Sequence, residues 1–244
     1  MKSEMIKLGL IGYGTMGREI DAIASANGFV VTDRIDLDNP LDPNNHYEFD
    51  IAVDFSYPKA VLPNLEILAA MGKDIVIGAT GWYDELERAR QITEKSDVGV
   101  VWGSNFSIGM QIMFKLTQAA ARYADKFPEY DVFMQESHHK RKKDSPSGTA
   151  ISLAEIIIKE SSMKSKIAGD LSQRSPDHDE LCIGVTRGGE VPGTHSVFFD
   201  SIADTIEIKH TARNRGGLAK GALFAAKSIY GRKGFFEFPD LFIW

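Results

Sequence analysis

A glycine-rich turn at residues 12–17, with the sequence Gly-Tyr-Gly-Thr-Met-Gly, constrains the fold of this chain more than any other stretch. An apolar run at 6–11 precedes the turn and predicts a strand, and the residues at 18–26 predict a helix. A second strand is expected to start at Phe29. A glycine turn inside such a βαβ unit is typical of dinucleotide-binding domains.

Each glycine of the turn has its own role if a dinucleotide binds there. Gly12 permits the tight turn, Gly14 lets the backbone approach a pyrophosphate, and Gly17 lets helix and strand pack closely. An acidic residue about 20 positions further on, at the end of the second strand, holds the ribose hydroxyls in such domains. Asp36 is the expected ribose ligand, with two neighbouring carboxylates as alternatives, Asp33 and Asp38.

Strand and helix patterns alternate up to residue 107, which predicts an α/β fold with a Rossmann-type, doubly wound parallel sheet. Further strands are expected at 50–56, 74–77 and 98–102, with helices at 60–71 and 84–95. Ligands of such sheets bind beyond the carboxyl ends of the strands. The expected cofactor-binding residues, besides Asp36, are therefore Gly12, Tyr13, Gly14, Thr15, Met16, Gly17, Gly78, Ala79, Thr80, Ser104, Asn105, Phe106 and Ser107.

After residue 107 the regular alternation stops, and the chain becomes strand-rich. This change predicts a separate, smaller α+β domain. Helices are expected at 108–123 and up to Lys159, strands at 130–135, 182–187, 193–199 and 204–210, and a polar loop at 161–180. An alanine-rich helix at 218–230 and an apolar tail at 234–244 follow.

The stretch 136–150 holds two adjacent histidines, four consecutive cations and a predicted helix start. Ser145 or Ser147 can cap this helix. The N–H groups of Gly148 and Thr149 would then face a bound carboxylate or phosphate. Taken alone, the stretch fits a capped surface helix after a solvated basic loop equally well.

Composition limits the function classes. The chain has 244 residues and a formal net charge of −6, so no nucleic-acid partner is expected, and the basic stretch is expected to serve a small anion. The single cysteine, Cys182, excludes an internal disulfide and fits a reducing compartment. No apolar run approaches the ~20 residues of a membrane helix, and no signal-peptide layout is present, so we expect a cytoplasmic protein. Histidine, cysteine and acidic residues lack metal-ligand spacing, so no metal site is expected.

The pattern His-His-x-x-Lys-x-Asp-x-Pro-Ser-Gly-Thr-Ala at 138–150 closely resembles the signature of the dihydrodipicolinate reductase family, whose members are also called 4-hydroxy-tetrahydrodipicolinate reductases. Residues 78–81 and 104–107 resemble the family segments that hold the nicotinamide half of the cofactor, although Ala79 and Ser104 depart from them. Segments at 187–189, 193–199 and 234–240 also resemble the family, so the resemblance covers nearly the whole chain.

The resemblance implies the reduction of 4-hydroxy-tetrahydrodipicolinate to tetrahydrodipicolinate by NADH or NADPH, in the diaminopimelate pathway to lysine. The substrate is a small cyclic imine with two carboxylates. By resemblance His138 and Lys142 are catalytic, and His139, Gly148 and Thr149 bind the substrate. Histidine, with an ordinary pKa of about 6.5, and lysine both suit proton donation to the reduced intermediate. The nicotinamide supplies the hydride.

The resemblance also implies the domain organisation. Residues 1–107, completed by 212–244, form the dinucleotide-binding domain. Residues 108–211 form a substrate-binding and oligomerisation domain with an open mixed sheet, which associates into a homotetramer.

NADH is expected to be preferred, because a 2′-phosphate would meet the carboxylate of Asp36. Leu37 offers no cation to the phosphate, whereas Arg34 could reach round, so dual use stays open.

Two other functions compete with this one. Another two-domain NAD(P)-dependent oxidoreductase would share the glycine turn but not the signature at 138–150. A non-catalytic redox sensor would keep the turn and Asp36 and would not need His138, His139 and Lys142. A structural role is expected for His195, although it could line the cleft.

Overall fold

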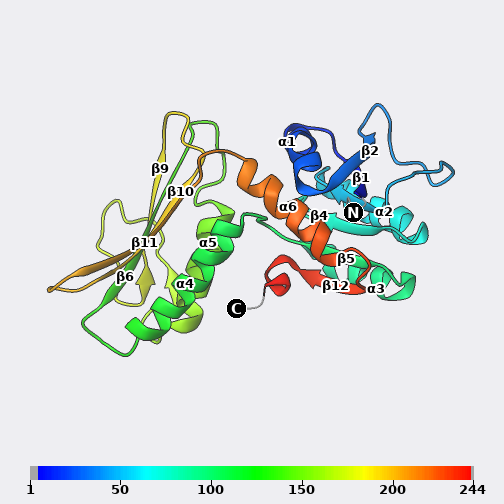
Figure 1. Cartoon of the computed structure of the whole chain (residues 1–244). Helices are drawn as coiled ribbons and strands as arrows, with labels where there is room; N and C mark the ends of the chain where they lie inside the picture. Colours follow the sequence, from blue (N-terminus) through cyan, green and yellow to red (C-terminus); the bar gives the residue numbers. More distant parts are fainter. Residues whose placement is uncertain (1–4, 243–244) are drawn as a thin grey trace. The chain divides into compact units, whose positions relative to one another are not determined.

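The structure is a computed structural model that describes residues 5–242, and it divides into two compact units (Figure 1). The first unit extends to Ser107 and includes the chain again from Arg215. The second unit comprises Ile108–Asn214 and is called the central unit below. Within residues 5–242, no helix has both the length and the apolarity needed to cross a bilayer.

The first unit is built on a six-stranded parallel sheet with the order β12-β5-β4-β3-β1-β2. β3 and β4 are buried at every position, as expected for parallel strands covered on both faces. The strands are β1 Ile6–Ile11, β2 Phe29–Ile35, β3 Ile51–Asp54, β4 Asp74–Ile77, β5 Gly99–Trp102 and β12 Gly234–Glu237. The helices are α1 Thr15–Ala24, α2 Pro58–Ala70, α3 Leu86–Ser96 and α6 Gly216–Ile229, with short 3-10 turns at η1 Ser25–Asn27, η2 Tyr83–Glu85 and η3 Phe238–Leu241. The predicted Rossmann-type fold is confirmed.

The end of the chain contributes a strand where the sequence predicts only an apolar tail. β12 pairs with β5 in parallel, and Gly99 lies opposite Gly234. A side chain at Gly99 would come within 2.1 Å of the Arg232 carbonyl oxygen, so glycine is needed for this close approach. The buried carboxylate of Asp74 accepts hydrogen bonds from the amides of Gly99 and Gly231, both at 2.8 Å. These contacts between distant segments are invisible in the local pattern.

The central unit contains a mixed sheet with the order β11-β10-β6-β9, in which only the β6–β9 pair is parallel. Its elements are α4 Ile108–Ala124, β6 Asp131–His138, α5 Gly148–Glu160, β9 Ile183–Arg187, β10 Thr194–Asp200 and β11 Thr205–Thr211. A small pair, β7 Lys166–Ile167 and β8 Glu180–Leu181, lies in the region predicted as a loop.

Side chains of the central sheet alternate between two environments. Met134, Val197 and Phe199 belong to a buried core shared with α4 and α5. Phe133 and Phe198 lie at the alternate positions of β6 and β10, and their rings stack with centroids 4.8 Å apart. Since successive residues of a strand face opposite sides, these two rings lie on the sheet face away from the helical core.

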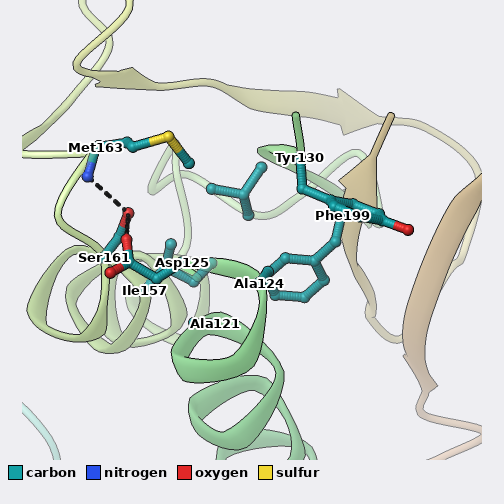
Figure 2. A pocket seen from close by; sticks show the side chains of 9 residues that line it. Ala121, Ala124, Asp125, Tyr130, Ile157, Ser161, Met163 and Phe199 are labelled. Atoms are coloured by element: carbon teal, nitrogen blue, oxygen red, sulfur yellow. Dashed lines mark hydrogen bonds between the residues drawn. The ribbon is translucent and has the colours of Figure 1, made fainter. Parts of the chain in front are cut away.

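A cavity of about 10 Å³ lies inside the core of the central unit (Figure 2). It has room for at most a single water molecule, so it is a packing defect rather than a ligand site. Its lining residues are Ala121, Ala124, Asp125, Tyr130, Val132, Ile157, Ser161, Met163 and Phe199, none of them a predicted site residue.

Candidate active site

The glycine turn between β1 and α1 has the geometry that a dinucleotide needs. Gly12 has a φ of +81°, and a Cβ there would lie 2.7 Å from the backbone of Phe55. A Cβ at Gly17 would lie 2.6 Å from the Gly12 carbonyl oxygen. Gly14 has open space beside it and begins α1 without a side-chain cap. The bare amides of α1 can therefore receive a diphosphate, and the residues fit a dinucleotide.

The other predicted cofactor residues lie beyond the carboxyl ends of β2, β4 and β5. A Cβ at Gly78 would lie 2.3 Å from the Phe55 ring, so glycine is required at this strand end. Thr80 and Ser104 are exposed, and Asn105 accepts a hydrogen bond from the Ser107 amide at 2.8 Å.

Two of the expected cofactor residues have side chains that serve the protein core instead. The ring of Phe106 is buried, with its centroid 4.6 Å from that of Phe238. The Ala79 methyl group is also buried, and its carbonyl oxygen accepts a hydrogen bond from the Trp82 indole at 2.9 Å. For both residues, only the backbone remains for contact with a cofactor.

The acidic end of β2 is exposed, and its nearest cation is already paired. Asp36 follows the last residue of β2 and accepts a hydrogen bond from the Leu37 amide at 2.9 Å. Arg34 donates two hydrogen bonds to Asp21 on α1, at 2.7 and 3.0 Å. Its guanidinium also lies 5.7 Å from the ring centre of Tyr13 in the glycine turn. Arg34 is thereby held beside the turn by a carboxylate.

His138 is the last residue of β6 and is buried, rather than lying in the solvated loop that the sequence suggests. It is two residues beyond Glu136, so both side chains point to the same side of the strand. The sheet register brings in two further groups, because Glu136 lies opposite His195 on β10, and His138 lies opposite Arg187 on β9.

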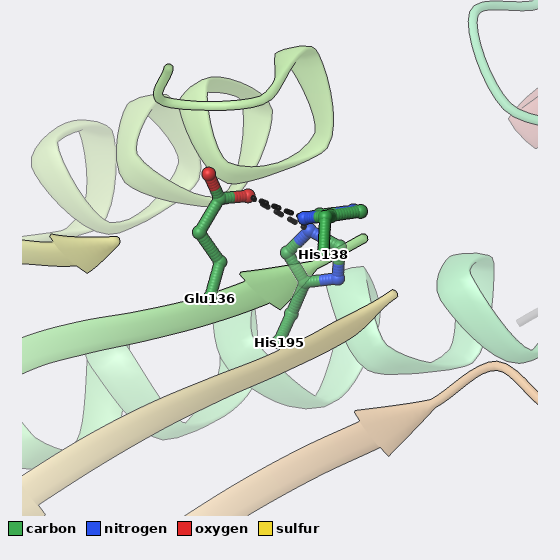
Figure 3. Close-up of side chains that lie close together, drawn as sticks. All are labelled: Glu136, His138 and His195. Atoms are coloured by element: carbon green, nitrogen blue, oxygen red, sulfur yellow. Dashed lines mark ion pairs between the residues drawn. The ribbon is translucent and has the colours of Figure 1, made fainter. Parts of the chain in front are cut away.

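The carboxylate of Glu136 is the centre of this cluster (Figure 3). One oxygen, Oε1, accepts hydrogen bonds from the Ser147 amide at 2.9 Å and from Arg187 Nη2 at 2.8 Å. The other, Oε2, accepts the hydroxyl of Ser147, and it lies 3.4 Å from His138 Nδ1 and 3.5 Å from His195 Nε2. The fold thus joins three strands and the start of α5 through one buried carboxylate.

Burial and charge act on these groups in opposite directions. Burial would raise the pKa of Glu136, but hydrogen bonds from Ser147 and Arg187 outweigh it and hold the pKa below its ordinary value. Burial lowers the pKa of His138, and Glu136 only partly offsets it. Burial, together with the nearby His138, lowers the pKa of His195 to about 4. At neutral pH the cluster therefore holds an ionised carboxylate and two uncharged imidazoles.

The cations of the signature differ in their surroundings. Lys142 is partly buried, and its ammonium group pairs with Asp144 at 2.8 Å. Arg141 pairs with Glu190 at 2.6 Å on the exposed surface. Lys140 and Lys143 are also exposed. Among these four residues, Lys142 is the cation with a restricted side chain and an influence on the pKa of His138.

Helix α5 begins at Gly148, and Ser147 is its cap rather than Ser145. The Ser147 hydroxyl accepts a hydrogen bond from the Ala150 amide at 3.2 Å. Open space lies beside Gly148, which is exposed, and Thr149 is partly buried. A hydrogen bond from the backbone of Gly148 helps to lower the pKa of Asp144, so this helix start already receives an acidic side chain.

Glu136, Ser147, Arg187 and His195 were not among the predicted site residues. The Glu-x-His spacing on a predicted strand could have indicated Glu136, because period two places both side chains on one face. Arg187 and His195 come from other strands, and only the sheet register brings them near. His139, a predicted site residue, is partly buried and directly follows β6.

A Rossmann-type sheet with a glycine turn suited to a dinucleotide, together with a unit that holds two uncharged imidazoles beside a capped helix start, is typical of a two-domain nicotinamide-dependent oxidoreductase. Comparisons with known proteins give the family. Residues 6–106 match the model "Dihydrodipicolinate reductase, N-terminus", and residues 109–242 match "Dihydrodipicolinate reductase, C-terminus". The chain belongs to the dihydrodipicolinate reductase family.

Individual relatives agree with this assignment. The chain is 38% identical over 236 residues to the 4-hydroxy-tetrahydrodipicolinate reductase of Christiangramia forsetii, covering 97% of both chains. It is 34% identical to the reductase of Ralstonia nicotianae, covering 94% of this chain and 86% of that one. The dipicolinate-bound dihydrodipicolinate reductase from Paenisporosarcina sp. TG-14 has the same fold, with a TM-score of 0.79, 22% identity and coverage of 98% and 100%.

Proposed function

We propose that this protein reduces 4-hydroxy-tetrahydrodipicolinate to tetrahydrodipicolinate with a nicotinamide cofactor, in the diaminopimelate pathway to lysine. The observation that carries the proposal is the arrangement within residues 138–150. A partly buried lysine and a buried histidine share one short segment with the capped start of α5. Membership of the reductase family over both halves of the chain supports this assignment.

In the proposed reaction the nicotinamide supplies the hydride, and the protein supplies the proton. His138 is the proposed proton donor in its imidazolium form, since its imidazole is held at the end of β6 by neighbouring groups. Lys142 is the proposed second donor, and its charge stabilises negative charge that develops on the substrate. The Asp144 carboxylate restrains the ammonium group of Lys142 at 2.8 Å.

The substrate carboxylates are proposed to bind at the start of α5. The amides of Gly148 and Thr149, together with the threonine hydroxyl, would donate hydrogen bonds to one carboxylate. His139 is proposed to contact the substrate from the other side of the segment. The relative from Paenisporosarcina, whose structure holds dipicolinate, is a member of the same family with a planar dicarboxylate bound.

NADH is the proposed preferred cofactor, with NADPH as a weaker alternative. Asp36 is exposed at the end of β2 and would accept hydrogen bonds from the ribose hydroxyls. The paired state of Arg34 supports this preference, because Asp21 already occupies one edge of its guanidinium and neutralises it.

The ratio of kcat/KM for NADH over NADPH, at fixed ionic strength, should exceed one. Asp36→Ala should move the ratio toward NADPH. Asp21→Asn should do the same and should also tighten the binding of adenosine 2′,5′-bisphosphate, because it releases Arg34. A wild-type ratio at or below one would refute the preference.

A homotetramer in the cytoplasm is the proposed state of the enzyme. The sheet face that carries Phe133 and Phe198 is the proposed contact surface between subunits, since an aromatic pair on an uncovered sheet face favours association. A cytoplasmic location fits the single cysteine, Cys182, and the biosynthetic role of the family.

The decisive test is NADH oxidation with substrate generated in situ by the synthase that precedes this enzyme. Absorbance at the NADH band should fall only when synthase, its substrates and this protein are all present. His138→Ala should slow the reaction strongly. Equal rates with simple sugar or amino-acid substrates would favour a different two-domain oxidoreductase, and cofactor binding without turnover would favour a redox sensor.

A further inference from the structure

The buried carboxylate of Glu136 lies between the two parts of the proposed site, namely the imidazole of His138 and the first turn of α5. Its Oε2 is 3.4 Å from His138 Nδ1, and its Oε1 accepts the Ser147 amide at 2.9 Å. Ser147 in turn caps α5. One side chain, itself 2% exposed, therefore contacts both the proton donor and the anion-binding helix start.

The protons around Oε2 can be assigned from the donors available. Ser147 has a single hydroxyl proton, which it donates to Glu136. His195 Nε2 lies 3.2 Å from the Ser147 hydroxyl oxygen and 3.5 Å from Oε2, so it must carry a proton of its own to avoid facing two acceptors.

The same reasoning fixes the tautomer of His138. Its Nδ1 has no hydrogen-bond partner of standard geometry among residues 5–242, and the ionised carboxylate of Glu136 lies 3.4 Å from it. A proton on Nδ1 gives an attraction, whereas a lone pair there would face a negative charge. Nε2 is then the atom that exchanges a proton. It lies beside Gly193, where a Cβ would come within 3.0 Å of it.

We propose that Glu136 is a positioning residue for both parts of the site. It fixes the neutral His138 as the Nδ1–H tautomer, so that Nε2 is the nitrogen that takes up a proton from solvent and then passes it from the imidazolium to the substrate. Through Ser147 it also anchors the start of α5, where a substrate carboxylate binds. The inference rests on the proposed function for these two roles, but the contacts of Glu136 do not depend on it.

A metal ion is the competing explanation for the cluster. Oε2, His138 Nδ1 and His195 Nε2 all lie within 4.8 Å of one another, and the two distances to Oε2 match the spacing of tetrahedral zinc ligands. Glu136 is, however, already bound by the Ser147 amide, the Ser147 hydroxyl and the Arg187 guanidinium. A cation paired with the carboxylate opposes a second cation, so the hydrogen-bonded network is favoured.

The charged groups around His138 define the expected effect of a substitution. Glu136 on its own strand and Asp144 in the following loop raise its pKa, whereas Lys142 and Arg187 lower it. His195 faces it from β10, with ring centroids 5.1 Å apart, and His210 lies opposite His195 on β11. Replacing Glu136 by glutamine removes the main attraction for a proton, so the pKa of His138 should fall further.

The first test is an NMR titration of His138 in the full-length protein. Glu136→Gln should lower the pKa of His138 and weaken the binding of pyridine-2,6-dicarboxylate about tenfold. Ser147→Ala should weaken dicarboxylate binding and leave the pKa of His138 within a few tenths of a unit. Glu160→Gln is the matched control, because it removes the charge that pairs with Arg122 at the opposite end of α5 and should change neither value.

The second test needs no variant and stays valid if Glu136→Gln fails to fold. Long-range ¹⁵N–¹H spectra of the wild type, above the pKa of His138, should show the proton on Nδ1. A proton on Nε2 would overturn the proposal, and so would an unchanged pKa in Glu136→Gln. Micromolar Zn²⁺ that raises the melting temperature of the wild type through these three side chains would assign a metal site instead.

These readouts separate the inference from the proposed function. If His138→Ala keeps full turnover, the proposed proton donor is wrong, whatever the NMR result. If turnover is lost but the tautomer and pKa of His138 do not depend on Glu136, only the present inference fails.

Discussion

At the scale of single residues, the site depends on burying charge without leaving it unpaired. An ionised carboxylate inside a protein is costly unless hydrogen bonds and an opposite charge compensate it. Glu136 meets this requirement through Ser147 and Arg187. The same burial keeps His138 and His195 uncharged, so the cluster can hold a proton acceptor and a carboxylate in contact.

Lys142→Ala should reduce turnover on the order of a hundredfold or more and leave the fold intact. The lysine side chain is 24% exposed, and in the proposed mechanism its charge stabilises the negative charge that develops on the substrate. Steady-state kinetics and the melting temperature measure the two effects. Lys143→Ala is the matched control, because Lys143 is exposed and lies next in the chain. Turnover near wild type in Lys142→Ala would remove Lys142 from the mechanism.

His195 should make the protein less stable in mild acid. Its pKa is about 4 in the folded protein, below the ordinary value of about 6.5, so the unfolded chain binds the proton more tightly between these values. The contribution of the uncharged His195 to the free energy of unfolding is complete above pH 6.5 and declines as the pH falls toward 4. At pH 5 the loss should be about 2 kcal/mol.

Urea unfolding at pH 7.5 and pH 5 measures this effect. The free energy of unfolding should differ less between the two pH values in His195→Asn than in the wild type, by about 2 kcal/mol. His46→Asn, which changes an exposed histidine, should behave like the wild type. Equal differences in His195→Asn and wild type would contradict the assignment.

At the scale of elements, a contact with strand β6 fixes the start of helix α5. Ser147 both caps the helix and donates to Glu136, so the helix start is tied to the strand that ends at His138. A capping residue alone would fix the start of the helix but not its position beside the sheet. The Glu136–Ser147 contact supplies that position.

Thr149→Val should weaken inhibition by pyridine-2,6-dicarboxylate about tenfold or more. The substitution keeps the size of the side chain and removes a hydroxyl that would donate to a carboxylate, a hydrogen bond worth about 1.5–3 kcal/mol. Inhibition constants measured against the substrate give the result, and Thr149→Ser should retain most of the inhibition. Equal constants for Thr149→Val and wild type would move the carboxylate site elsewhere.

At the scale of the whole molecule, the first unit is completed by a segment that is distant in sequence, whereas the central unit is one contiguous stretch. α6 and β12 complete the first unit, and Gly221 lets α6 approach so closely that a Cβ would lie 1.6 Å from the Phe106 carbonyl oxygen. In the central unit, the aromatic pair Phe133–Phe198 lies on the sheet face away from the core. This face is the proposed subunit contact.

Phe198→Glu should dissociate the proposed tetramer. A carboxylate on this face would be buried without a partner in the assembled state, which is strongly unfavourable. Analytical ultracentrifugation should show a smaller species for Phe198→Glu. Phe127→Glu, which changes an exposed ring just beyond α4, should sediment like the wild type. A wild-type protein that sediments as a monomer would refute the tetramer itself.

The sequence by itself determined the features that depend on local spacing. The glycine turn, the alternation of strands and helices, and the signature at 138–150 each predict their structure or family from neighbouring residues. The parallel sheet and the family assignment followed from them and are confirmed. Single residues remained ambiguous where two neighbours satisfied the same rule, as with Ser145 and Ser147 at the helix start.

Only the tertiary structure decided which distant groups meet. β12 joins the sheet because Asp74 accepts a hydrogen bond from the Gly231 amide and Gly99 permits a close approach of the Arg232 backbone. The sequence around Asp74 and Gly99 does not predict these contacts. Arg34 lies two positions from Asp36 but pairs with Asp21 on a helix. His195 and Arg187 reach Glu136 through strand register, although they lie 59 and 51 residues away from it in the sequence. That register depends on which hydrophobic faces and turns meet in the folded sheet, and the pattern of one strand does not identify its partner.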